Sequence, residues 1–434
     1  MKLKMPKADD LNNIQIQVSN AIGYEKRLGI VGGPGTGKSI VGIMNVMGDI
    51  KNPSKEVAFL VYSNNLQRLI STVIKNEVGS YDEYKVKTMH SWLWSYIRDI
   101  FINTEKYKNF EPNDIPKAFK IEEDEYPYNY EKIMEELKSI PRNKKKIYDY
   151  IIIDEAHDMP VGAFDIIKEA AKKVYIMYDD NQKFTVNNND EDIDYLDQSQ
   201  IFEKLGIEES FYDFTENYRN TRQIERVAKL FLQNYHTNNI TLKGITAHKD
   251  GDKPTIASYK KLHDLVSEIV SNYRKNPSQT IAVLLPKYMS SIGSLMPETR
   301  KMFVRNKDIN DGENFYYYFG NKKHSSEVQP DKGIFLMTYG NCKGLEFDTV
   351  YLPELNHPDM AGYLGPREHN NAIYTAITRS RNGLFLGLRE SGEENKITKI
   401  IHDNENVFGS VEIEEKQESS DLDDIDISED ELPF

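Results

Sequence analysis

A phosphate-binding loop constrains the fold of this chain more than any other feature of its sequence. Residues 32–39 read GGPGTGKS, which fits G-x-x-x-x-G-K-[S/T], between an apolar segment, 28–31, and a segment with helical apolar spacing. Glycines in such a loop let backbone N–H groups converge on phosphates at a helix N-terminus. A glycine-rich turn with a chance lysine is the alternative, and this strand–helix context disfavours it. We therefore predict ATP binding through Gly32, Gly33, Pro34, Gly35, Thr36, Gly37, Lys38 and Ser39.

Two adjacent carboxylates follow a second apolar segment. Residues 148–153 (YDYIII) are typical of a strand covered on both faces of a parallel sheet, and Asp154 and Glu155 come directly after it. Ligands bind at the carboxyl ends of such strands. We expect Lys38 to reach the phosphates, Ser39 and Asp154 to hold Mg²⁺, and Glu155 to orient and deprotonate the attacking water. A solvated acidic turn is the alternative for the carboxylates.

The rest of the chain alternates between predicted strands and helices, which indicates an α/β fold. A helix from residue 66 and a helix at 130–139 belong to the first half, and helices at 221–234 and 370–378 to the second. Segment 97–146 breaks the alternation and is interpreted as an inserted subdomain. Further predicted strands lie at 57–62, 84–88, 173–178, 280–285, 333–338, 349–352 and 383–388.

Composition excludes several classes of protein. The single cysteine, Cys342, rules out an internal disulfide, and the nine histidines show no metal-ligand spacing, so zinc is not expected. No apolar run approaches the roughly 18 residues of a membrane span, and the N-terminus lacks the apolar core of a signal peptide. We therefore expect a cytoplasmic protein with no membrane partner.

Acidic charge is concentrated in the last two dozen residues. The chain has a formal net charge of −14, of which segment 412–434, with eleven acidic residues against Lys416, contributes −10. A tail of this composition is predicted to be disordered in isolation. The remaining charge of −4 is compatible with a local basic groove for phosphates.

Two arginines in the second half occur next to predicted helices. Arg219 precedes a helix within ENYR, and Arg379 lies between a helix and a strand within AITR. Phosphoryl transfer needs positive charge where the γ-phosphate separates. Spacing alone leaves open whether these arginines supply it or form surface salt bridges.

In order along the chain, these motifs resemble superfamily 1 helicases of the UvrD/Rep/PcrA type, over roughly residues 11–381. The resemblance implies that Gln15 reads adenine, Gln182 couples the γ-phosphate to nucleic acid, and Tyr218 packs on adenine. It also implies that Glu346 contacts the ribose and that Arg219 and Arg379 touch the γ-phosphate. His157 stands in DEAHD where the family has glutamine.

Nucleic-acid contacts follow from the same resemblance. The segments at the ends of three predicted strands, 57–62, 84–88 and 333–338, are similar to motifs of this family and imply strand contacts by Tyr62, Asn64, Thr88, His90 and Thr338. An aromatic ring offers a sequence-tolerant platform for a base, although a tyrosine that ends a strand is also a common core residue. Trp92 and Trp94 are interpreted as packing residues of the following helix, with a contact to a base as the alternative.

The sequence departs from the family at three places. Phe184 and its neighbours replace a stacking tryptophan, and Ile40 stands where the related proteins have an arginine beside adenine. The stretch between 285 and 333 is too short for the large 2B subdomain. The missing 2B subdomain favours movement along a single strand over separation of a duplex.

We predict two RecA-like parallel-sheet P-loop NTPase domains with a small inserted subdomain and a disordered acidic C-terminal tail. The expected ranges are 1–96 with 147–208 for the ATP-binding domain (1A), 97–146 for a reduced 1B-like insertion, 209–410 for the second domain (2A), and 411–434 for the tail. The tail ends in DELPF, which resembles the tip of bacterial single-strand-binding proteins and implies a replication, repair or nuclease partner. A merely solubilising tail is the alternative.

The predicted function is an ATP- and Mg²⁺-dependent translocase or helicase that acts on single-stranded nucleic acid. The resemblance implies that this nucleic acid is DNA and that movement runs from 3′ to 5′. The expected setting is replication, repair or phage-related metabolism in a bacterial or phage-infected cell. Two alternatives stay open. One is an ATPase switch that senses single strands and regulates a partner such as a nuclease in phage defence. The other is a binding module that has lost its chemistry.

Overall fold

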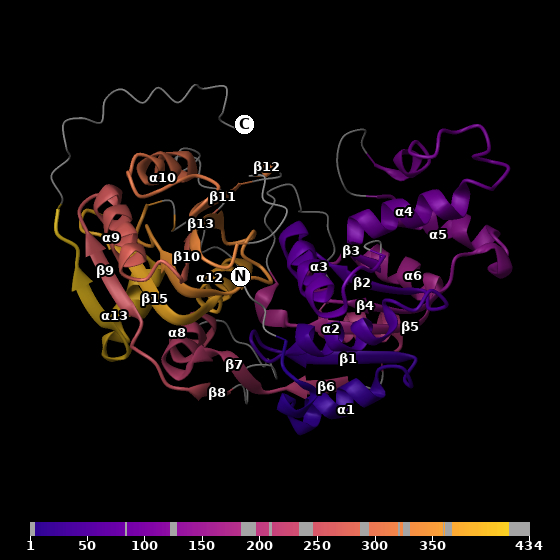
Figure 1. Cartoon of the computed structure of the whole chain (residues 1–434), viewed down its shortest axis with the longest axis horizontal. Coiled ribbons are helices and arrows are strands. Elements are labelled where there is room, and N and C mark those ends of the chain that lie inside the picture. The colour runs from indigo at the N-terminus through magenta and orange to yellow at the C-terminus, as the bar shows by residue number, and fades with distance from the viewer. Residues whose placement is uncertain are drawn as a thin grey trace.

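A computed structural model gives the arrangement of most of the chain. It describes residues 5–82, 85–121, 128–183, 197–207, 211–233, 246–286, 295–319, 322–323, 330–358, 360 and 367–415. Phe184 and the tail from residue 416 lie outside these ranges. Figure 1 shows two lobes side by side, the first in indigo and magenta and the second in orange and yellow.

The first lobe is built on a six-stranded sheet whose strand pairs are all parallel. β1 and β4 lie inside this sheet, so the phosphate-binding loop and the Asp154–Glu155 pair emerge at the same edge. In spatial order the strands are β3 (Val86–Thr88), β2 (Val57–Val61), β4 (Tyr148–Ile153), β5 (Ala171–Tyr178), β1 (Arg27–Gly32) and β6 (Phe211–Phe214).

Alternating side chains of this sheet enter two separate apolar clusters. Ile152 packs with residues of α2 and α3 on one face, whereas Ile151 and Ile153 pack with residues of α4 and α6 on the other. Burial on both faces explains the uninterrupted apolar run in β4. The helices of this lobe are α1 (Asn13–Ala21), α2 (Lys38–Asp49), α3 (Asn64–Val78), α4 (Met89–Phe101), α5 (Tyr130–Ser139), α6 (Val161–Ala170) and α7 (Gln198–Leu205).

The predicted insertion shares its core with the first sheet. Phe119, Ile133 and Leu137 are fully buried and belong to the same cluster as Leu60 of β2. Trp92 is 1% exposed and stacks on Tyr96 with ring centroids 5.1 Å apart, as the packing interpretation predicts. The described part of the insertion therefore extends the first lobe.

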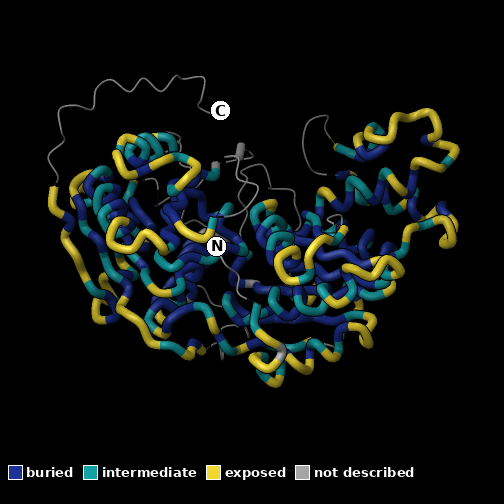
Figure 2. The backbone as a smooth tube through the Cα atoms, in the orientation of Figure 1, coloured by how far each residue is buried: buried dark blue, intermediate teal, exposed yellow. Residues whose placement is uncertain are grey.

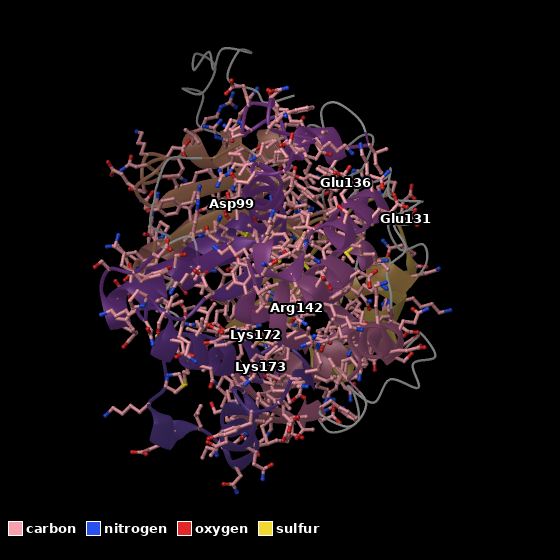
Figure 3. The ribbon with its side chains drawn as sticks, turned by 90° about the vertical axis from the view of Figure 1, so that its right-hand side faces the viewer. Asp99, Glu131, Glu136, Arg142, Lys172 and Lys173 are labelled. Atoms are coloured by element: carbon pink, nitrogen blue, oxygen red, sulfur yellow. The ribbon has the colours of Figure 1, made fainter. Side chains whose placement is uncertain are left out.

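Charged side chains cover the side of the first lobe that faces away from the second. Asp99, Glu131, Glu136, Arg142, Lys172 and Lys173 are labelled on this side in Figure 3, and each is exposed or partly exposed. Lys172 pairs with Asp149 at 2.8 Å and Lys106 with Glu136 at 2.5 Å. This surface is solvated, and the predicted catalytic and nucleotide-binding residues lie elsewhere.

The second lobe is built on an eight-stranded sheet in which only the β11–β12 pair is antiparallel among the described pairs. Its strands in spatial order are β12 (Lys322–Lys323), β11 (Phe315–Phe319), β13 (Gly333–Thr338), β10 (Thr280–Leu285), β14 (Phe347–Leu352), β15 (Ser380–Arg389), β9 (Thr255–Tyr259) and β16 (Gly409–Glu412). A separate parallel pair joins β7 (Glu216–Thr221) to β8 (Thr246–Lys249).

Five α-helices belong to the described part of the second lobe: α8 (Arg222–Gln233), α9 (Leu262–Lys275), α10 (Leu295–Val304), α12 (Arg367–Ile377) and α13 (Lys396–His402). Figure 2 shows the strands of both sheets largely buried and the exposed residues gathered on outer loops and helix faces. In the described ranges, no helix combines the length and apolar character needed to cross a bilayer.

Two predicted boundaries need correction. β6 pairs with β1, so the first sheet extends past the predicted limit at 208. Val411 and Glu412 belong to β16, which pairs with β9, so the tail begins later than 411. Both strands are short, at sheet edges and only partly buried, which leaves a weak apolar pattern in the sequence.

Candidate nucleotide-binding and active site

The phosphate-binding loop joins β1 to α2 as the sequence predicts. Gly35 and Gly37 have φ angles of 73° and 90°, values at which a side chain is strained. Lys38 Nζ donates to the carbonyl oxygens of Gly32 at 2.6 Å and Gly33 at 3.0 Å, and Thr36 Oγ1 donates to Gly33 O at 2.8 Å. The loop therefore holds its lysine against its own backbone at the start of α2.

Gln15 reaches this loop from α1. Its backbone and side chain form a reciprocal capping box with Asn12, and its Nε2 donates to Thr36 O at 3.1 Å. A Cβ atom at Gly37 would lie 2.5 Å from the side-chain amide of Gln15 and would displace it, and the φ of 90° also favours glycine at this position. This contact places Gln15 beside the loop, where the resemblance expects the adenine-reading residue.

Asp154 and Glu155 lie at the carboxyl end of β4 and are both buried. Burial, reinforced by the charge of Glu155, raises the pKa of Asp154 to about 7. Burial acts in the same direction on Glu155, but His157, Lys38 and Arg379 outweigh it and lower the pKa of that carboxyl. Glu155 also has a φ of 54°, a strained value for a residue with a side chain.

The residues present fit a magnesium ion. Asp154 Oδ2 is buried without a hydrogen-bond donor among the described residues, and Ser39 lies close enough to lower the pKa of this carboxyl. Carboxylate and hydroxyl oxygens are ligands that Mg²⁺ accepts alongside phosphate oxygens and water. Among the described residues, no group of three or more His, Cys, Asp and Glu side chains forms a metal site by protein ligands alone.

A buried polar turn after β5 lies next to the carboxylates. Asp179 accepts hydrogen bonds from Asn181 N at 3.0 Å and from Gln182 Nε2 at 2.6 Å. Its own backbone N–H donates to His157 Nδ1 at 3.2 Å. Gln182 is therefore held in a fixed rotamer beside the predicted base.

The second lobe supplies both predicted arginines. Arg379 is 1% exposed and donates from its guanidinium to Gln182 Oε1 across the two lobes. Arg219 Nε donates to Glu346 Oε2 at 2.7 Å, and Arg381 pairs with the other oxygen of that carboxylate. Although burial favours the neutral acid, the two arginines lower the pKa of Glu346 to about 2.

Tyr218 stands at the margin of the site with 48% of its surface exposed. Its hydroxyl accepts from Asn12 Nδ2 at 2.8 Å and donates to Glu216, and its ring stacks on His248 with centroids 5.5 Å apart. A supported, exposed aromatic ring suits stacking on a base.

These groups line a common cavity of about 490 Å³ between the lobes. The predicted residues at its wall are Gln15, Pro34, Gly35, Thr36, Gly37, Lys38, Ser39, Glu155, Gln182, Tyr218, Arg219, Glu346 and Arg379, with Ile40 beside them. Gly32, Gly33 and Asp154 are buried and do not line the cavity. Lys249 of β8 and Arg381 also line the cavity but were not predicted, because neither falls in a motif with its own chemical signature.

The predicted nucleic-acid contacts lie in different environments. Tyr62 is partly buried and Asn64, the first residue of α3, is exposed. Thr88 and Thr338 are buried, and their hydroxyls accept backbone hydrogen bonds from Ser91 and Asn341. His90 is partly buried, and burial lowers its pKa to about 4. The two threonines thus have structural hydrogen bonds, while Tyr62 and Asn64 have accessible surface.

Two known protein families match successive parts of this chain. Residues 26–291 match the family described as Schlafen group 3, DNA/RNA helicase domain, and residues 318–391 match the UvrD-like helicase C-terminal domain. The resemblance that the motifs indicate is therefore confirmed.

Individual relatives match over shorter ranges. A putative ATP-dependent DNA helicase of Acanthamoeba polyphaga mimivirus is 24% identical over 266 residues, which are 58% of this chain and 36% of that protein. DNA helicase II of Rickettsia typhi is 28% identical over 158 residues, 31% of this chain and 24% of that protein. The aligned parts thus make up about a third and a quarter of these relatives.

Among solved structures, the C-terminal domain of a possible DNA helicase from Lactobacillus plantarum aligns with 44% of this chain and 98% of its own, at 19% identity and a TM-score of 0.31. The family match rests on the sequence of 26–291, which is more than half of the chain. The chain belongs to the Schlafen group 3 DNA/RNA helicase domain family.

Proposed function

We propose that this chain is an ATP-dependent motor that moves along single-stranded nucleic acid, with DNA as its track. The observation that carries the proposal is the meeting of Arg379 from the second lobe with Gln182 from the first, at the wall of the cavity that contains Lys38 and Glu155. A site assembled from two lobes makes hydrolysis depend on their relative position. The family and the helicase names of the relatives support the same function.

Each residue of the cavity has a role in the proposed hydrolysis. Lys38 binds the β and γ phosphates, and Glu155 orients the attacking water and accepts its proton. Mg²⁺, when held by Ser39 and Asp154, neutralises charge that develops on the phosphates. Arg219 and Arg379 stabilise the separating γ-phosphoryl group, and Gln182 links that event to the nucleic-acid side.

The remaining roles concern recognition. Gln15 and Tyr218 bind the adenine and Glu346 the ribose. Tyr62, Asn64, Thr88, His90 and Thr338 form the proposed path of the strand. Movement from 3′ to 5′ and a place in replication, repair or phage-related metabolism belong to the same proposal.

ATP hydrolysis titrated with single-stranded DNA, single-stranded RNA and duplex tests this function. We expect turnover to rise most with single-stranded DNA. Equal turnover with and without every nucleic acid would contradict the motor, and an absence of any turnover under all conditions would indicate a non-catalytic binding module.

A nucleic-acid-sensing ATPase switch is the second candidate. Between β10 and β13 the described residues form only α10, β11 and β12, in a stretch of fewer than 50 residues. The switch would control a partner such as a nuclease without separating strands. A strand-displacement assay run beside the ATPase titration tests for duplex separation, since stimulated turnover without displacement argues against a helicase and favours translocation or switching.

The acidic tail is proposed to recruit a protein partner. This proposal rests on the terminal DELPF sequence alone, because the tail lies outside the described residues. Deletion of residues 432–434 is expected to remove a replication, repair or nuclease partner from a pull-down. Unchanged partner capture together with unchanged single-strand affinity would contradict it.

A further inference from the structure

A buried ion pair joins the two lobes beside the active site. Lys343 of the second lobe places Nζ 2.6 Å from Oδ1 of Asp158 in the first, and the two side chains are only 5% and 6% exposed. Asp158 ends the short helical turn η5 (Ala156–Asp158), three residues after the proposed base Glu155. Because a buried charge is unfavourable without its partner, relative movement of the lobes must act on this pair.

His157 connects this pair to Glu155. Its Nδ1 accepts a hydrogen bond from Asp179 N, which is possible only when that nitrogen is unprotonated, so the ring proton lies on Nε2. Nε2 lies 3.3 Å from Glu155 Oε2 and 3.8 Å from Asp158 Oδ2. The imidazole thus lies between the two carboxylates and close to both, although its Nε2 has no hydrogen-bond partner among the described residues.

The opposite side of the pair faces a proposed nucleic-acid contact. Lys343 Nζ lies 5.9 Å from the centre of the Tyr62 ring, within the range of a cation–π interaction. A Cβ atom at the neighbouring Gly344 would lie 2.8 Å from Leu66 of α3, and Asn65 Nδ2 donates to Asn341 O at 3.5 Å. The Lys343 segment is therefore packed tightly on the segment that follows Tyr62.

We propose that Lys343 and Asp158 are positioning residues that couple strand binding to hydrolysis. A nucleobase bound at Tyr62 fixes the position of Lys343, Lys343 fixes the position of Asp158, and His157 transmits that position to Glu155. This inference rests on the proposed function and specifies how the strand regulates the ATP site. The contacts form one continuous physical path between the two sites. Tyr62 at its start is partly buried, whereas the side chains between it and the ATP site are buried and therefore have few alternative positions.

The test compares stimulation by oligothymidylate in the full chain and in variants. The principal variant is Lys343→Met with Asp158→Asn, which removes both charges together and so leaves no buried charge unpaired. We define the stimulation ratio as turnover with oligothymidylate divided by turnover without it. The double variant is expected to bind a non-hydrolysable ATP analogue and the oligonucleotide with the affinities of the unmodified chain, but its stimulation ratio should be about tenfold lower. Asp158→Asn alone, which keeps a polar partner for Lys343, should show the same loss.

Two further variants separate coupling from packing. Lys145→Met is the matched control, because Lys145 is also buried, at 4% exposed, and pairs with Glu169 within the first lobe. It should keep the full stimulation ratio. His157→Gln keeps an N–H donor and is expected to retain most of the ratio, whereas His157→Leu loses it.

An unaltered stimulation ratio in the doubly substituted chain would overturn the coupling proposal. A loss of the ratio in Lys145→Met equal to that of the double variant would overturn it too, because the effect would then follow from stability. If the unmodified chain itself shows no stimulation by any nucleic acid, the proposed function fails instead, so the two failures are distinguishable.

Discussion

Arg219 and Glu346, which are 127 positions apart in the chain, are joined by a 2.7 Å hydrogen bond between Nε and Oε2. Arg381 holds the other carboxylate oxygen. The arginine proposed to contact the γ-phosphate is thereby bound to the residue proposed to contact the ribose, within the wall of one cavity. Binding of the nucleotide at this wall must act on both residues together.

Glu346→Gln is expected to lower stability in a pH-dependent way. The pKa of Glu346 is about 2 in the folded chain against an ordinary 4.5, so the carboxylate stabilises the fold above about pH 4.5, by about 3 kcal/mol. That contribution is lost as the pH falls from about 4.5 towards 2. Urea unfolding of both chains at pH 7 and at pH 3 checks this, and a stability difference that is the same at both pH values would contradict it.

Substitutions of Lys38 and Glu155 should separate binding from hydrolysis. Lys38→Ala removes the charge that binds the phosphates and is expected to abolish turnover. Glu155→Gln removes the base but keeps the side-chain shape, so ATP should still bind while hydrolysis stops. Equilibrium binding of a fluorescent ATP analogue and phosphate release measure the two properties, with exposed Glu131→Gln as the control. Unreduced turnover in Glu155→Gln would show that another group is the base.

Arg379→Ala is expected to reduce turnover by about 10³-fold or more, because a positive charge at the separating phosphate is lost. Arg219→Ala should have a comparable effect. The affinity for ATP should change far less than the rate if the charge acts in the transition state. Arg222→Ala is the matched control, since Arg222 pairs with Asp250 on the surface at 2.6 Å and should retain full turnover.

Gly35→Ala should disturb the contact between the lobes. A Cβ atom there would lie 2.5 Å from both Arg219 Cβ and Asn217 Oδ1, and the φ of 73° is itself unfavourable by about 1–2 kcal/mol. We expect lower stability and lower turnover. Gly48→Ala in α2 is the control, since nothing lies within 4 Å of its added Cβ and helical alanine stabilises by about 0.5–1 kcal/mol. Thermal unfolding of both variants tests this prediction, and equal stability of Gly35→Ala and Gly48→Ala would contradict it.

Strong local patterns allowed much of the fold to be predicted. The strands at 148–153, 280–285 and 333–338 have the predicted bounds because each is an apolar run buried on both faces. β9 was not predicted, since only alternate residues of its short sequence, TIASY, are buried. β6 and β16 were missed for a related reason: edge strands need fewer apolar residues.

The sequence by itself determined the chemistry of this protein, because a phosphate loop, a carboxylate pair and an arginine motif are each made of neighbouring residues whose local geometry follows from their identities. Only the tertiary structure decided which of these groups meet. Arg379 reaches Gln182, and Lys343 reaches Asp158, because the two lobes pack against each other. Such pairs depend on packing between distant segments, and spacing along a chain carries no information about that packing.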